Sequence, residues 1–423
     1  MSKVEDPINQ IEAVAGNGLL HRRAFLKAGV LVAGAGTFLS AKAAPPEIDS
    51  WSTVPGAPPG AYGDRSRFEA GVVRTVRNRP PALGEGSSRT PLAALEGIIT
   101  PGALHFERHH NGIPDIDPAK HRLLIHGLVD RPLIFDLETL SRYPLVSRIQ
   151  FLECAGNSFE VTPPQPARSS VQAMYGLLSC SEWTGVPLSS LLDEAGVQAK
   201  GKWVIAEGAD SALMTRSVPL SKMMDDAIVA IYQNGERLRP GNGYPMRLFL
   251  PGWEGNMSVK WLRQLKVAER PAMTREETSK YTDLLPDGRA KIFTYPMEVK
   301  SVITTPSGEQ SMRGPGLYQI SGLAWSGAGR IRKVEVSADG GRTWAEAELT
   351  GPVLPKALTR FRMAWRWNGG QAILQSRAID ETGAVQPTRA ALMNDRGPQY
   401  IYHYHAIQSW QVNENGEVYN VYA

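Results

Sequence analysis

The chain has 423 residues, of which 42% are hydrophobic, and its formal net charge is only +4. This length exceeds that of one ordinary domain, so two domains preceded by an N-terminal segment are expected. Basic and acidic residues nearly balance at 46 and 42, with no basic block beyond the N-terminus, which argues against a nucleic-acid-binding protein.

The N-terminus has the features of an export signal. Arg22 and Arg23 precede an apolar run, which ends at the small-residue site Ala41-Lys42-Ala43. This order predicts a twin-arginine signal peptide over residues 1–44 and a mature protein in the periplasm. The run is shorter than the roughly 20 residues that a membrane span needs, so no membrane anchor is expected. The twin-arginine route carries folded proteins, which suits a chain that receives a cofactor before export.

Residues 45–95 are rich in Pro, Gly and Arg and lack periodicity, which predicts an extended arm laid over a domain. From residue 96 to 290, strand-like runs dominate and short helical segments separate them, so an α+β domain is expected. The expected strands are 122–129, 132–137, 148–153, 202–208, 227–238, 246–252 and 259–267, and the expected helices are 136–143 and 187–196. Residues 291–423 contain short strands separated by turns, which predicts an immunoglobulin-like β-sandwich.

Cys154 stands where the apolar run 148–153 meets the small residues Ala155-Gly156-Asn157. Small residues tolerate tight backbone geometry and the close approach of a ligand. A thiolate at this position could bind a soft metal or act as a nucleophile. Two alternatives are a buried structural cysteine and, in an exported protein, a disulfide with Cys180.

This C-A-G-N turn resembles the thiolate-bearing turn of the sulfite oxidase family of molybdenum enzymes. Two further segments carry the resemblance, FERHHNGIP at 106–114 and GNGYPMRLFLPGWEGNMSVKWL at 241–262. It implies a molybdopterin domain at 96–290, a dimerisation domain at 291–423 and a molybdenum-molybdopterin cofactor with Cys154 as the metal ligand. By the same resemblance, the cofactor-binding residues are Phe106, Arg108, His110, Cys154, Asp210, Asn242, Arg247, Ser258 and Lys260.

The resemblance also implies three catalytic residues that would bind an anionic product, namely Arg108, Tyr281 and Arg396. Arginine suits a phosphate or a sulfur oxyanion because its fork donates two hydrogen bonds. Asn242 departs from the family pattern, which often has His there. Two alternatives for 104–117 are a solvated basic loop and a zinc cluster of its histidines, His105, His109 and His110, while His403 and His405 are expected to pack on one face of a strand.

Phe159 stands where many sulfite-oxidising members have arginine. The segments at 163–170 and 174–188 resemble the molybdenum subunits of bacterial sulfane dehydrogenases, a branch of this family. That resemblance implies oxygen-atom transfer to sulfane sulfur on a carrier protein, and a homodimer of this subunit within a heterotetramer. Since the chain has no Cys-x-x-Cys-His, it has no c-type haem of its own, and a cytochrome c subunit is the expected electron acceptor.

Three other functions stay open on the sequence. A direct sulfite dehydrogenase would use the same cofactor and the same residues. An exported scaffold with a degenerate site would use the sandwich to bind a partner. A Cys-His thiol hydrolase is the weakest of the three, because no base or oxyanion motif accompanies Cys154.

Overall fold

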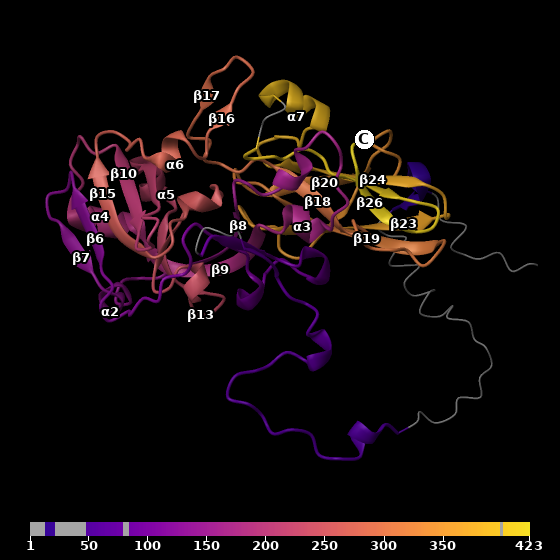
Figure 1. Ribbon diagram of the computed structural model, residues 1–423, viewed down its shortest axis with the longest axis horizontal. Helices are drawn as coiled ribbons and strands as arrows, with labels where there is room; N and C mark the ends of the chain where they lie inside the picture. The colour runs from indigo at the N-terminus through magenta and orange to yellow at the C-terminus, as the bar shows by residue number, and fades with distance from the viewer. Residues whose placement is uncertain (1–12, 22–47, 79–83, 398–400) are drawn as a thin grey trace, which may run out of the picture.

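The computed structural model describes residues 13–21, 48–78, 84–397 and 401–423. A mixed α/β domain and a β-sandwich lie next to each other, so the predicted fold class is confirmed (Figure 1). Arg22, Arg23 and the expected cleavage site at 41–43 lie outside the described residues. Within the described part, no helix is both long and apolar enough to cross a membrane.

The first domain contains a five-stranded sheet that is antiparallel except where β15 pairs with β6. Its strands in spatial order are β11 (Thr215–Pro219), β10 (Trp203–Gly208), β15 (Leu262–Ala268), β6 (Leu123–Gly127) and β7 (Leu133–Phe135). Alternate residues of β10 are buried, as the pleat of a strand requires. The short helices are α2 (Leu137–Leu140), α4 (Leu188–Ala195) and α5 (Leu220–Asp225). Leu188, Leu191 and Leu192 of α4 are buried in the same core, which explains their helical spacing.

A second sheet presents Cys154. Its main strands are β13 (Glu236–Arg237), β12 (Ile228–Gln233), β9 (Leu178–Pro187) and β8 (Val146–Glu153), and β14 (Arg247–Phe249) also pairs with β12. Because β8 ends at Glu153, Cys154 follows directly at the end of a paired strand. Short 3-10 turns nearby are η7 (Phe159–Val161), η8 (Pro240–Asn242) and η9 (Gly255–Met257).

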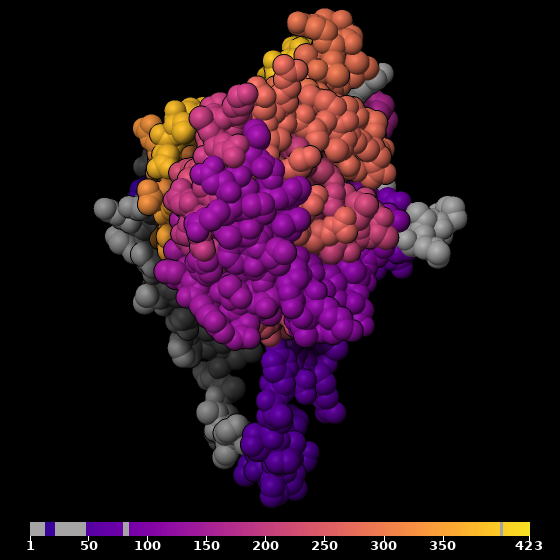
Figure 2. All heavy atoms as spheres, turned by 90° about the vertical axis from the view of Figure 1, so that its left-hand side faces the viewer, coloured from indigo at the N-terminus to yellow at the C-terminus, as the bar shows by residue number. Residues whose placement is uncertain are grey.

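The expected arm is only partly extended. Its end forms a third sheet, in which β3 (Thr75–Asn78) pairs with β4 (Gly86–Arg89), and β4 pairs with β5 (Glu107–His109). The earlier part has the 3-10 turns η3 (Ser50–Ser52) and η4 (Arg67–Glu69) and is largely exposed. Figure 2 shows this part projecting away from the body, so most of it does not lie over a domain.

The second domain packs two antiparallel sheets face to face, as predicted for a sandwich. One sheet contains β18 (Lys300–Thr305), β19 (Gly316–Trp325), β22 (Glu348–Thr350) and β23 (Thr359–Trp367), extended by β1 (Ala13–Ala15) and β2 (Leu19–Leu20). The other contains β20 (Ile331–Ser337), β21 (Ala345–Glu346), β24 (Ala372–Asp380), β25 (Ser409–Val412) and β26 (Val418–Val421). The chain between the domains carries α6 (Arg275–Thr278) and the hairpin β16 (Asp283–Leu284) and β17 (Ala290–Lys291), and α7 (Arg389–Arg396) precedes β25.

The two domains share a hydrophobic core. Phe151 of β8 and Tyr175 of α3 (Val171–Tyr175) belong to the same buried cluster as Trp325 and Trp410 of the sandwich. The side chains of Glu153 and Lys300 form a buried ion pair across the same boundary, at 2.9 Å. The strand that ends at Cys154 is therefore held by both domains.

Candidate active site

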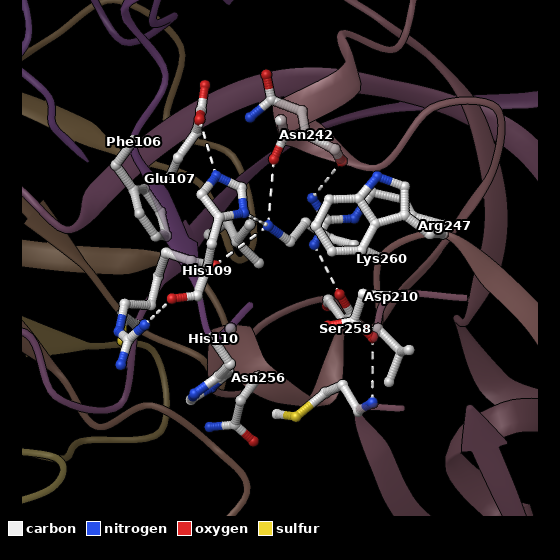
Figure 3. Close-up of a pocket in the computed structure, with 18 of the residues that line it drawn as sticks. Phe106, Glu107, His109, His110, Asp210, Asn242, Arg247, Asn256, Ser258 and Lys260 are labelled. Carbon is white, nitrogen blue, oxygen red and sulfur yellow. Dashed lines mark hydrogen bonds and ion pairs between the residues drawn. The ribbon is translucent and has the colours of Figure 1, made fainter. Parts of the chain in front are cut away.

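A hollow of about 690 Å³ lies at the end of β8. All nine predicted cofactor-binding residues line it, together with Tyr281. Figure 3 shows Arg247, Lys260, Asp210 and Asn242 gathered around one side of this hollow. Arg396, the remaining predicted residue, does not line it.

Cys154 is held in place by its backbone. Its amide donates to the carbonyl of Leu177 at 3.0 Å, and its own carbonyl accepts from the amide of Asn157 at 2.8 Å. The side chain of Asn157 also donates to Glu153 at 2.9 Å, and its oxygen accepts from the amide of Leu177. Burial raises the pKa of the Cys154 thiol, so a cation or a metal must stabilise the thiolate.

Arg247 is a buried cation without a carboxylate partner among the described residues. Its guanidinium donates to the carbonyl oxygens of Asn242 and Ser258, at 2.9 and 2.7 Å, and its side chain is 2% exposed. Burial lowers its pKa, because the charged form is poorly solvated there. The Ser258 hydroxyl accepts from the amide of Leu250 at 3.0 Å, which fixes the neighbouring turn.

Lys260 adds a second cation to the same wall. Its ammonium donates to the carbonyl of Arg108, to that of Gly241 and to Nδ1 of His109, at 3.1, 3.2 and 2.8 Å. His109 in turn contacts Glu107 at 2.9 Å, which fixes the ring (Figure 3). Burial, followed by the charge on Arg247, lowers the pKa of Lys260 to about 7.

These residues fit an anionic, polar ligand such as a pterin with a phosphate tail. Arg247 and Lys260 face the hollow, and their printed partners in the described chain are carbonyl oxygens and a His nitrogen, so an anion would compensate the cost of burying these cations. Oδ1 of Asn242, which lines the hollow, is also buried without a hydrogen-bond partner among the described residues. Buried polar atoms are normally satisfied, so a ligand is the expected partner.

Tyr281 also lines the hollow. Its hydroxyl is 3.2 Å from Nε2 of His110, and the guanidinium of Arg216 stacks 4.9 Å from the ring centre. Burial raises the pKa of Tyr281 far above neutral pH, so the phenol stays protonated and can donate a hydrogen bond. Its backbone has φ +55°, an uncommon conformation for a bulky residue.

Arg396 lies at the end of α7, where it forms an ion pair with Glu298. His403 contacts the same Glu298 at 3.1 Å and Glu254 at 3.1 Å, and its backbone amide donates to the carbonyl of Ala155 at 2.9 Å. His403 has a positive φ and lies outside the strands, so the expectation of two histidines on one strand face was wrong. His403 instead connects the C-terminal part of the chain to the turn at Cys154, through its hydrogen bond to Ala155 and its contacts with Glu254 and Glu298.

The free energy of unfolding should depend on pH through His403. Burial alone would lower its pKa, but the hydrogen bonds with Glu254 and Glu298 raise the pKa to about 10. A pKa raised above its unfolded value of about 6.5 stabilises the folded state fully below that pH, and the effect is lost as the pH rises toward 10. Thermal unfolding of the wild type and of His403→Gln should therefore differ most at pH 6 and converge by pH 10. A constant difference over this range would contradict the prediction.

Two of the alternatives, the zinc cluster and the disulfide, are excluded within the described chain. No group of three or more His, Cys, Asp or Glu residues there is arranged to hold a metal ion, so His105, His109 and His110 do not form the alternative zinc cluster. His105 stacks on Phe106, whereas the other two face different partners. Cys154 and Cys180 are both free thiols, which excludes the alternative disulfide.

Four residues important to this geometry were missed as site residues: Glu107, Glu254, Asn256 and Glu298. Glu107 and His109 are two residues apart in β5, and that spacing could have indicated that they share a face. Asn256 lies inside the segment 241–262 that already carried the resemblance. Nothing in the sequence pattern points to Glu254 or Glu298, because their partner His403 is more than 100 residues away.

Comparisons with known proteins agree with this site. The family description "Oxidoreductase molybdopterin binding domain" matches residues 110–276, and "Mo-co oxidoreductase dimerisation domain" matches residues 291–409. Chicken (Gallus gallus) sulfite oxidase is 30% identical, over 85% of this chain and 81% of its own length. The chain belongs to the sulfite oxidase family. The human (Homo sapiens) member is 31% identical, over 75% of this chain and 64% of its own.

A solved structure extends this likeness along most of the chain. The sulfane dehydrogenase SoxCD from Paracoccus pantotrophus matches with a TM-score of 0.86 and 48% identity, over 89% of this chain and 97% of that one. Membership of the family makes this protein a molybdenum-dependent oxidoreductase with a molybdopterin cofactor. The scaffold and thiol hydrolase alternatives are therefore set aside.

Proposed function

We propose that this enzyme oxidises sulfane sulfur carried on a partner protein and passes the electrons to a separate c-type cytochrome subunit. It acts in the periplasm after twin-arginine export, as a homodimer of this subunit within a heterotetramer. The observation that carries this proposal is the 48% identity to a sulfane dehydrogenase along 89% of the chain. The sulfite oxidases are more distant, at 30 to 31%.

A second, wider hollow supports a substrate delivered on an arm. Its volume is about 1700 Å³, and its lining includes Cys154, Arg108 and Tyr281 together with Phe159 and Tyr402. A free sulfite ion would occupy a small part of this space. An arm that carries a sulfane sulfur at its tip could enter the wide hollow and place that sulfur next to the cofactor site.

Phe159 favours the same substrate. It is the first residue of η7 and 47% exposed at the wide hollow. An arginine there would attract a free dianion, whereas a phenyl ring offers apolar contact to a peptide or an alkyl arm. The residue thus lowers the affinity for free sulfite while leaving room for the carrier.

The site residues have different roles in the proposed reaction. The bound cofactor supplies two-electron oxygen-atom transfer, which side chains alone cannot perform. Cys154 would ligate the molybdenum, while Arg247 and Lys260 would neutralise the anionic parts of the cofactor. Arg108 and Tyr281 would hold the anionic product by donating hydrogen bonds. Arg396 is paired with Glu298, so it would bind the product only after releasing that carboxylate.

Phe159→Arg should shift the substrate preference. We expect the variant to raise kcat/KM for free sulfite by about tenfold, since one added positive charge near a dianion contributes on the order of 1.4 kcal/mol. Oxidation of carrier-bound sulfane should decrease. Steady-state assays with both substrates measure this, and Phe159→Leu is the matched control that removes the ring without adding charge.

Direct oxidation of sulfite to sulfate is the second candidate, favoured by the sulfite oxidases among the relatives. The wild-type enzyme separates the two functions, since each predicts a different preferred substrate. Turnover of carrier-bound sulfane well above that of free sulfite supports the proposal. Rapid turnover of sulfite alone, with no effect of the carrier protein, would establish the second candidate instead.

A further inference from the structure

The segment that directly precedes the predicted export motif pairs with the sandwich domain. β2 (Leu19–Leu20) is antiparallel to β23, with Leu19 opposite Trp365 and Leu20 opposite Ala364. Figure 1 shows this indigo segment at the end of the molecule formed by the sandwich, far from the arm that follows it in sequence. Since β19 occupies one edge of β23, β2 lies on the other edge, which β22 covers only at residues 360–362.

Side chains and backbone both anchor this segment. Leu19 is fully buried in the main core, and Leu20 is buried against Ala364. The indole of Trp365 donates to the carbonyl of Asn17 at 2.8 Å, and the Asn17 amide group donates to the carbonyl of Ala338, also at 2.8 Å. These contacts tie the segment to β23 and to the turn after β20, so both sheets hold it.

The fit depends on the two glycines around Asn17. A Cβ atom on Gly16 would lie 2.2 Å from a carboxylate oxygen of Asp339, and one on Gly18 would lie 2.1 Å from the carbonyl oxygen of Arg366. Gly18 also has φ +87°, which disfavours other residues. The pairing therefore requires glycine at position 18, where an added side chain would meet backbone, and restricts position 16, where it would meet the side chains of Asp339 and Thr343.

We propose that residues 13–20 are a built-in ligand of the sandwich domain. In the precursor they close the edge of β23, directly before the predicted export motif in the sequence. Removal of the signal uncovers that edge. An unpaired strand edge tends to pair with other chains, so the segment protects the precursor from association before export. The uncovering step rests on the proposed twin-arginine export, whereas the docking itself does not.

Hydrogen exchange tests the docking. The full precursor and the chain that starts at residue 45 are compared in the peptide that covers β23, with β19 as an internal reference. We expect the amide of the Ala364–Trp365 pair that faces β2 to exchange at least about tenfold faster without the segment, since its backbone partner is lost, while the amides that face β19 stay protected. Added synthetic peptide 12–21 should restore the slow exchange of the shorter chain, and the same peptide with Gly18→Val should not. Equal exchange in the two chains would overturn the proposal.

Variants of the precursor separate docking from export. Leu19→Asp should give the fast exchange of the shorter chain, whereas Val14→Ser, at an exposed position of β1, should leave slow exchange unchanged. N-terminal sequencing of protein recovered from the periplasm tests the removal step. Exported protein that retains residues 13–20 would refute the uncovering of the edge while leaving the docking result intact. Absence of export altogether would refute the proposed localisation.

Discussion

Cys154→Ser should abolish turnover while the protein stays folded. Serine has nearly the same size, so the turn at the end of β8 keeps its backbone hydrogen bonds to Leu177 and Asn157. Its hydroxyl is a poor substitute for a soft thiolate as a molybdenum ligand. Loss of outer partners of a metal site costs about 10 to 100-fold, and loss of the ligand itself should lower kcat more than that. Steady-state turnover with an artificial electron acceptor measures the effect without the cytochrome.

Cys180→Ala is the matched control, because Cys180 is buried in the core and lines neither hollow. It should keep normal turnover with at most a modest loss of stability. Circular dichroism establishes that both variants are folded, and metal analysis gives their molybdenum content. Full turnover by Cys154→Ser would contradict the ligand role.

Lys300→Met should destabilise the protein by about 3–5 kcal/mol, because it leaves the Glu153 carboxylate buried without its cation. Glu153 is fully buried and accepts hydrogen bonds from Lys300, Asn157 and the indole of Trp325, at 2.9, 2.9 and 2.6 Å. Two neutral donors cannot compensate for the lost positive charge. Equilibrium unfolding in denaturant measures the change in free energy.

The control is Lys333→Met, which removes a more exposed ion pair with Glu335 and should cost less than about 1 kcal/mol. Adding Glu153→Gln to Lys300→Met should recover part of the loss, since the buried group is then neutral and its oxygen can still accept from Trp325. A loss for Lys300→Met no larger than that of the control would show that the interdomain pair contributes little.

Most of the predicted residues that line the site lie in three contiguous stretches of sequence, and Asp210 and Tyr281 are the exceptions. The turn at Cys154, the segment 106–114 and the segment 241–262 each keep a recognisable order of residues, and the fold brings them to one hollow. The strands and the sandwich were predictable for a similar reason, since alternation and turn residues are local signals. Signals that involve only neighbouring residues can therefore be recognised from the sequence alone.

What could not be predicted depends on pairs that are distant in sequence. Glu153 and Lys300 are 147 residues apart, and His403 is 149 residues from Glu254. In the sequence each of these residues is indistinguishable from an exposed charged residue, and only the folded structure shows that it is buried and paired. The pairing of Leu19 and Leu20 with β23 was also missed, because the residues before a signal motif carry no strand pattern of their own.

The shared core sets an order of events for the newly made protein. Cys154 is synthesised long before Lys300. During that interval β8, which ends at Glu153, lacks the ion-pair partner Lys300 and the sandwich residues of the shared core. The carboxylate next to the metal ligand gains its cation only when the last third of the polypeptide has emerged and folded. We therefore expect maturation with molybdopterin to follow translation of the whole chain, and a prematurely terminated product not to retain the cofactor.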